Sequence, residues 1–89
     1  MMRWRAWFVP SDDEVRDPRQ LAQLIAGRKV TSLLCVPSLY ALLLKVGGDR
    51  LGGLDTVIVA GESCPPHLVE QHFEMLPETR LFNEYGPTE

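Results

Sequence analysis

The apolar residues of this chain alternate between runs of strand length and helical spacings. Residues 30–36 and 56–60 form nearly unbroken apolar runs, the pattern of strands buried on both faces. Shorter runs at 5–9 and 79–82 predict a first and a last strand. Between these runs, three groups of apolar residues repeat at helical spacing: Leu21, Leu24 and Ile25; Leu39, Leu42, Leu43 and Val46; Leu68, Val69, Phe73 and Leu76.

Proline, glycine and aspartate mark the limits of these helices. Asp17 followed by Pro18 is a typical helix start, with a capping side chain and proline at the first helical position. Gly27 and the pair Gly47-Gly48 predict helix ends. Pro77 predicts the end of the last helix.

Strands that alternate with helices of this length predict an α/β fold, in which βαβ units form a small parallel sheet with packed helices. Ligands of such sheets bind where the strands end. The predicted strand ends are Val36, the turn Gly61-Glu62 and the segment Asn83-Glu84-Tyr85. We therefore expect these three places to lie on one rim.

Composition limits the classes of function. The chain has 89 residues, a net charge of −3 and two cysteines, Cys35 and Cys64, without metal-ligand spacing. The acidic balance argues against nucleic acid or an anionic membrane as a partner. Residues 33–46 are broken by Pro37 and too short to span a bilayer, and residues 1–9 lack the pattern of a signal peptide. These features favour a reducing, cytoplasmic setting.

The last seven residues, NEYGPTE, concentrate the polar chemistry of the chain. The aromatic ring can lie on a purine, the hydroxyl can reach a phosphate, and a carboxylate can hold a cation such as Mg²⁺. A polar turn at a chain end is the simpler interpretation of these residues alone.

Other features of the sequence do not indicate a functional site. His67 and His72 lie about 140° apart on a helix, so they do not share a face that could hold a metal. The glycine pairs do not form the pattern of a phosphate-binding loop. Ser63 lacks a nucleophile elbow, and Cys64 fits a tight turn better than a reactive thiol.

Three segments together carry a resemblance: VTSLLCVPSLYALLL, LDTVIVAGESCPPHLVEQ and LFNEYGPTE, in this order. They resemble the middle of an adenylation domain of the adenylate-forming (AMP-binding) enzymes, in the branch of the nonribosomal peptide synthetases. The resemblance covers residues 12–89, so residues 1–11 form an atypical N-terminal segment beside a partial adenylation domain. It implies that an amino acid is activated with ATP and Mg²⁺ to an aminoacyl adenylate. The aminoacyl group is then loaded onto the phosphopantetheine of a carrier protein.

The resemblance also implies roles for single residues. The residues expected around the nucleotide are Gly61, Glu62, Ser63, Asn83, Tyr85 and Thr88. Glu89 is expected to coordinate Mg²⁺. The amino-acid pocket is expected to be lined by Leu34, Ile58, Ala60 and Glu84. Glu84 would favour a mostly apolar side chain that ends in a hydroxyl or a positive group, a tyrosine-like amino acid for example; alternatively, its carboxylate bonds a neighbouring backbone group or faces water.

Several parts of the family pattern have no counterpart here. The sequence lacks the lysine-bearing phosphate loop, the aspartate for the substrate amine, the ribose-binding aspartate and the C-terminal catalytic lysine. We expect a fragment that is inactive alone. Two other classes stay open: a flavodoxin-like or receiver-like domain, suggested by Asp12-Asp13, and a non-catalytic binding remnant of the family fold.

Overall fold

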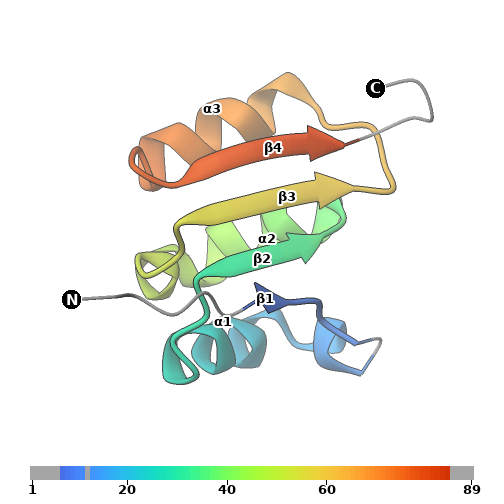
Figure 1. Ribbon diagram of the computed structural model, residues 1–89. Helices are drawn as coiled ribbons and strands as arrows, with labels where there is room; N and C mark the ends of the chain where they lie inside the picture. The colour runs from blue at the N-terminus through green and yellow to red at the C-terminus, as the bar shows by residue number, and fades with distance from the viewer. Residues whose placement is uncertain (1–6, 12, 85–89) are drawn as a thin grey trace.

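The computed structural model describes residues 7–11 and 13–84. Its centre is a four-stranded sheet in the order β1-β2-β3-β4, in which all neighbouring strands are parallel (Figure 1). The predicted α/β fold with a parallel sheet is therefore confirmed. The elements in chain order are β1 (Trp7–Phe8), η1 (Glu14–Arg16), α1 (Pro18–Gly27), β2 (Ser32–Cys35), α2 (Pro37–Gly47), η2 (Gly48–Leu51), β3 (Thr56–Ala60), α3 (Pro66–Met75) and β4 (Arg80–Glu84).

The helices cover one face of the sheet. Figure 1 shows α2 and α3 behind the strands, and α1 packs against α2. Along β3 burial alternates, so that Val57 and Val59 are buried while Ile58 and Ala60 are only partly buried. The sequence predicted strands covered on both faces, but the described residues cover only the face of Val57 and Val59. We call this the covered face and the opposite side the open face.

The core lies between the covered face and the helices. Apolar side chains from both strands and helices exclude water there, and each contributes free energy in proportion to the apolar area that it buries. Its fully buried apolar members are Ala22, Leu33, Tyr40, Leu43, Leu44, Leu51, Val57, Val59 and Leu68.

The start of α1 follows the prediction. One carboxylate oxygen of Asp17 accepts hydrogen bonds from the backbone N–H groups of Arg19 (3.2 Å) and Gln20 (3.3 Å). These two donors have no partner within the helix, so the side chain caps them. The helix ends at Gly27 as predicted, but the backbone enters the left-handed region only at Lys29, with φ of 55°.

The buried sides of the later helices differ from the predicted ones. On α3 the sequence pattern predicted Leu68, Val69, Phe73 and Leu76 together, whereas Val69 and Phe73 are exposed and His72 is buried. On α2 the buried side includes Tyr40 and Leu44 in place of Leu42 and Val46. The difference on α2 arises because this helix packs against both α1 and β3.

The last strand is longer than its apolar run. The sequence analysis ended this strand at Phe82 and placed Asn83 and Glu84 in a loop. In the structure β4 continues to Glu84, because Asn83 pairs with Val59 and Glu84 pairs with Ala60 of β3. Pairing with a neighbouring strand therefore outweighs the low strand preference of these two polar residues.

Candidate functional site

The turn after β3 requires a glycine. Gly61 has φ of +87°, a left-handed conformation that other residues adopt only with strain. A Cβ atom at this position would lie 3.3 Å from Cγ1 of Val36, which directly follows β2. The ends of β2 and β3 are therefore in close contact, as the predicted common rim requires.

Glu62 connects this turn to the start of α2. One of its carboxylate oxygens accepts the backbone N–H of Ser38 (3.1 Å), and the other accepts the Ser38 hydroxyl (3.1 Å). The residue that precedes α2 is Val36, whose side chain forms no capping hydrogen bond. Glu62 thus caps a helix that is distant in sequence, and its negative charge suits the positive end of the helix dipole. The sequence analysis did not identify this role or Ser38.

The four residues assigned to the amino-acid pocket share the open face. Leu34 pairs in register with Ile58, and Ala60 pairs with Glu84. Partners in register point to the same side of a sheet, and Ile58 and Ala60 are two residues apart on one strand. The structure therefore brings Leu34, Ile58, Ala60 and Glu84 to one side, with Glu84 exposed. Asn83 lies on the opposite side of β4.

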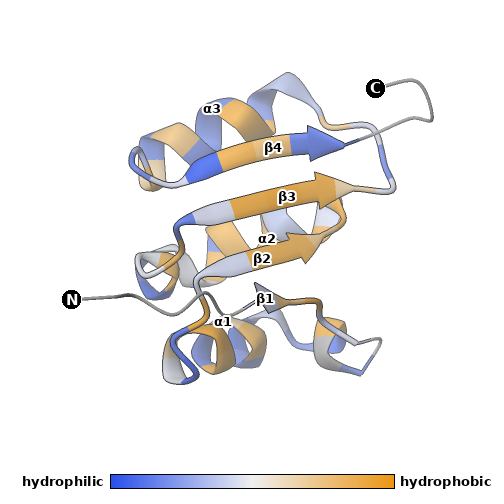
Figure 2. Cartoon of the chain, in the orientation of Figure 1, coloured by the Kyte–Doolittle hydropathy of each residue, from blue (hydrophilic) through white to orange (hydrophobic). Residues whose placement is uncertain are grey.

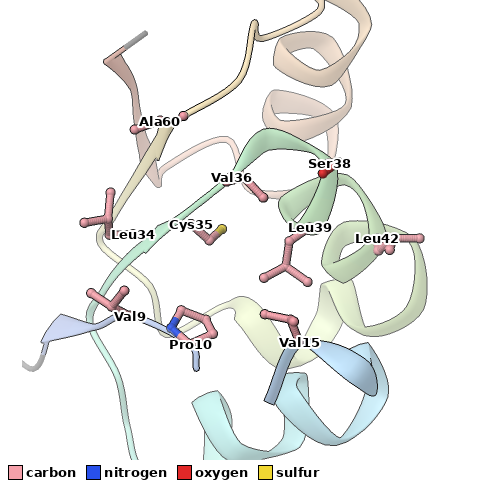
Figure 3. Close-up of a pocket in the computed structure, with 11 residues that line it drawn as sticks. Val9, Pro10, Val15, Leu34, Cys35, Val36, Ser38, Leu39, Leu42 and Ala60 are labelled. Carbon is pink, nitrogen blue, oxygen red and sulfur yellow. The ribbon is translucent and has the colours of Figure 1, made fainter. Parts of the chain in front are cut away.

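An apolar cavity of about 610 Å³ lies at the carboxyl ends of β1, β2 and β3 (Figure 3). Of the predicted site residues, Leu34, Ala60 and Gly61 line it. The opposite wall is formed by Val9, Pro10 and Val15, which the sequence analysis did not assign to the site. The strand pairing of β1 with β2 brings this early segment to the rim, and no short-range sequence signal predicts that.

Cys35 also lines this cavity. Burial raises the pKa of its thiol from an ordinary 9.0 to about 12. Burial also raises the pKa of the Cys64 thiol. The thiolate is the reactive form, so neither cysteine has the environment of a catalytic nucleophile. This agrees with the structural role predicted for Cys64.

A second depression of about 550 Å³ lies between α2 and α3. Glu62 and Ser63, both predicted near the nucleotide, line this depression together with Ser38. His67 and Lys45 lie along the same depression. Polar and basic groups therefore collect beside the Gly61 turn.

Three residues predicted to bind the nucleotide or Mg²⁺ lie outside the described residues. They are Tyr85, expected at the adenine or ribose, Thr88, expected at a phosphate, and Glu89, expected at Mg²⁺. Within residues 7–11 and 13–84, no group of three or more histidine, cysteine, aspartate or glutamate side chains could hold a metal ion. The assignment of Glu89 to Mg²⁺ stays a prediction. Also within these two ranges, none of the helices combines the length and the apolar character needed to cross a bilayer.

His72 is fully buried. Its Nδ1 atom lies 2.5 Å from the Tyr40 hydroxyl, and its Nε2 atom lies 2.7 Å from the carbonyl oxygen of Thr79. The carbonyl can only accept, so Nε2 donates to it and Nδ1 accepts from Tyr40. The hydroxyl of Thr79 in turn donates to the carbonyl of Leu54 (2.8 Å). This network joins α2, α3 and the loops that precede β3 and β4, and so fixes the start of β4.

Comparison with known proteins shows the family of this chain. A family model described as "AMP-binding enzyme" matches residues 2–89. The chain belongs to the AMP-binding enzyme family. The flavodoxin-like or receiver-like alternative is accordingly not favoured.

Relatives of this AMP-binding chain are peptide synthetases. It is 48% identical to bacitracin synthase 3 of Bacillus licheniformis over 73 residues, which is 82% of the chain and 1% of that protein. It is 38% identical to gramicidin S synthase 2 of Brevibacillus brevis over 82 residues, which is 91% of the chain and 2% of that protein. The chain thus spans only a few per cent of the length of these curated relatives.

A solved structure shows the same fold. PA1221, described as a nonribosomal peptide synthetase protein with adenylation and PCP domains, superimposes with a TM-score of 0.68 at 36% identity. The match covers 82% of this chain and 15% of that protein. The four-stranded parallel sheet and its helices are therefore part of an adenylation-domain fold.

Proposed function

We propose that this chain supplies one wall of the amino-acid and nucleotide site of an adenylation domain in a nonribosomal peptide synthetase. The observation that carries the proposal is the similarity to two peptide synthetases, which extends over 82 and 91% of the chain. The shared rim formed by Val36, Gly61 and the end of β4 supports it.

The proposed reaction begins with the carboxylate of an amino acid. A carboxylate oxygen attacks the α-phosphorus of ATP, the bond to the β-phosphate oxygen breaks, and pyrophosphate leaves. The product is an aminoacyl adenylate, a mixed anhydride with AMP as its leaving group. A carrier-protein thiol on phosphopantetheine then receives the aminoacyl group and AMP is released. Neighbouring residues must hold the two reactants in line, which lowers the entropic part of the barrier.

In this proposal the open face of the sheet orients the amino acid. Leu34, Ile58 and Ala60 offer an apolar surface, and Glu84 is the charged group among them. A carboxylate in an apolar pocket is stabilised by a donor on the substrate side chain. We therefore expect preference for an apolar side chain that ends in a hydroxyl or a positive group, with a tyrosine-like amino acid as the best match.

The Gly61 turn is proposed to border the nucleotide. Gly61 and Asn83 would frame the adenine, and Tyr85 would stack on it or border the ribose. Glu62 and Ser63 would lie alongside, and Thr88 would bind a phosphate oxygen. Glu89 would hold Mg²⁺, whose positive charge offsets the charge that develops on the phosphates. The proposal places this chemistry in the cytoplasm, where ATP is available and Cys35 and Cys64 stay as free thiols.

A chimera tests the proposal. Residues 31–89 replace the matching segment of an intact adenylation domain, and amino-acid-dependent ATP–pyrophosphate exchange is measured with each proteinogenic amino acid. We expect exchange with a changed order of substrates. Glu84→Ala should change that order again, whereas Glu78→Ala, an exposed carboxylate just before β4, should not.

Two outcomes would contradict the proposal. A folded chimera without exchange for any amino acid would argue against the assigned function. An order of substrates that is unchanged by Glu84→Ala would show that this carboxylate does not contact the substrate. The 89-residue chain alone should show no exchange above a blank, because it lacks the lysine-bearing loop that would hold the phosphates.

A further inference from the structure

The turn after β3 is attached to the start of α2 at two points. At the first point, a Cβ atom on Gly61 would lie 3.3 Å from a methyl group of Val36. At the second, both carboxylate oxygens of Glu62 bond Ser38, one to its backbone N–H and one to its hydroxyl, each at 3.1 Å. Figure 3 shows Val36 and Ser38 together where α2 begins. The two points fix the position of the turn relative to the end of the sheet.

The start of α2 requires a cap from outside the helix. The residue before the helix is Val36, which has no polar side-chain atom and forms no capping hydrogen bond. Pro37, the first helical residue, has no N–H group. The N–H of Ser38 is therefore the first donor of the helix, and it has no partner within the helix. Glu62 accepts this donor, so the helix and the turn stabilise each other.

The same contact orients the charge of Glu62. In Figure 2 the orange strand β3 is followed by a connection that contains a blue segment, where this carboxylate enters the rim. A carboxylate that pointed at the phosphates of a nucleotide would repel them. Here both oxygens are directed to Ser38, and the positive end of the α2 dipole offsets their charge.

We propose that Glu62 is a positioning residue of the nucleotide site. Its side chain acts through Ser38 and holds the backbone of residues 61–63 beside the nucleotide, without a contact of its own to the nucleotide or to Mg²⁺. This inference rests on the proposed function, because it assigns one residue of that site its part.

The proposal predicts which step of the reaction depends on Glu62. A turn that is held before ATP arrives does not have to be ordered on binding, which saves conformational entropy and increases affinity. Leu34 and Ile58 are held by strand pairing and do not depend on this cap. Loss of the cap should therefore weaken the binding of ATP and leave the choice of amino acid unchanged.

Backbone order parameters of the 89-residue chain, measured by NMR relaxation, test whether Glu62 holds the turn. For residues 61–63 they should be about 0.85 in the unchanged chain and fall below about 0.6 in Glu62→Ala. Glu62→Gln should keep the higher value, because its amide can accept the Ser38 N–H and donate to the hydroxyl. Glu74→Ala removes another exposed carboxylate, on α3, and should have no effect. Equal order parameters in the unchanged chain and Glu62→Ala would overturn the proposal.

A double-mutant cycle tests whether Glu62 acts through Ser38. Glu62→Ala should lower the folding equilibrium constant of the chain about tenfold, the usual effect of a lost cap. In a Ser38→Ala background the same change should lower it only about threefold, because the backbone N–H is then the one remaining partner. The same factor in both backgrounds would overturn the proposal, since it would show that the two side chains act independently.

The chimera that carries residues 31–89 tests the role in the reaction. Glu62→Ala should raise the KM for ATP about tenfold with the order of amino acids unchanged, whereas Glu62→Gln should stay within about threefold of the original KM. A merely destabilised enzyme would instead lose kcat, because less of it would be folded. If the carboxylate bound Mg²⁺ or the nucleotide directly, Gln would be as harmful as Ala, and the proposal would be wrong. A folded chimera without any exchange contradicts the proposed function instead, and the order parameters and the cycle still decide whether Glu62 holds the turn.

Discussion

The two faces of this sheet carry similar apolar residues, but these residues are buried on one face and partly exposed on the other. Leu33 and Leu34 are neighbours on β2, yet Leu33 is fully buried beneath the helices while Leu34 lies on the open face. Val57 and Ile58 form the same contrast on β3. The covered face therefore serves stability. The open face carries apolar residues that the described residues leave partly exposed.

The largest difference between the faces should appear on shortening these two leucines. Leu33→Ala leaves a cavity in the core and should lower the free energy of unfolding by about 3 kcal/mol. Leu34→Ala should lower it by less than about 1 kcal/mol, because the side chain is partly in water already. Urea unfolding measures both. Equal losses would show that the open face contributes to stability as much as the covered one.

The buried histidine should produce the next largest effect. His72→Phe removes the acceptor of the Tyr40 hydroxyl and the donor to the Thr79 carbonyl, and both groups stay buried. We expect a loss of about 2–3 kcal/mol in the free energy of unfolding. Tyr40→Phe removes one partner only and should cost less. The double variant should cost less than the sum of the two, and strict additivity in this cycle would contradict a coupled network.

The contact between α1 and α2 can be probed at the last residue of each helix. A Cβ atom on Gly47 would overlap Cβ of Ala22, so Gly47→Ala should force the helices apart. The expected cost is about 1–3 kcal/mol. Gly27→Ala is the matched control, because nothing lies within 4 Å of its Cβ position. That change should be neutral or stabilise the chain by up to about 1 kcal/mol, and thermal unfolding compares the two.

The smallest effect concerns the thiol of Cys35. Its pKa is raised by burial from 9.0 to about 12, so the folded chain holds a proton that the unfolded chain releases at lower pH. The stability that this group contributes is fully present below pH 9 and is lost as the pH rises toward 12. In a Cys64→Ser background, alkylation of Cys35 at pH 8 should be far slower in the folded chain than in urea. Similar rates would show that the thiol is accessible and ionised in the folded state.

The sequence alone predicted most of the architecture. Apolar runs of strand length, helical spacings and the capping residue Asp17 depend on local physics, since hydrogen bonds to near neighbours and side-chain periodicity decide them. These signals correctly predicted a parallel α/β sheet and the start of α1.

Contacts between residues that are distant in the sequence determine the features that the sequence pattern did not predict. The capping of α2 by Glu62 joins residues 24 positions apart, and Val9 and Pro10 reach the cavity only because β1 pairs with β2. Burial of His72 depends on partners from α2 and from the loop before β4. An apolar run shows that both sides of a strand tolerate burial. Which side is covered depends on the face against which the helices pack. Here the helices pack against one face of the sheet, which is therefore buried, while the described residues leave the other face open.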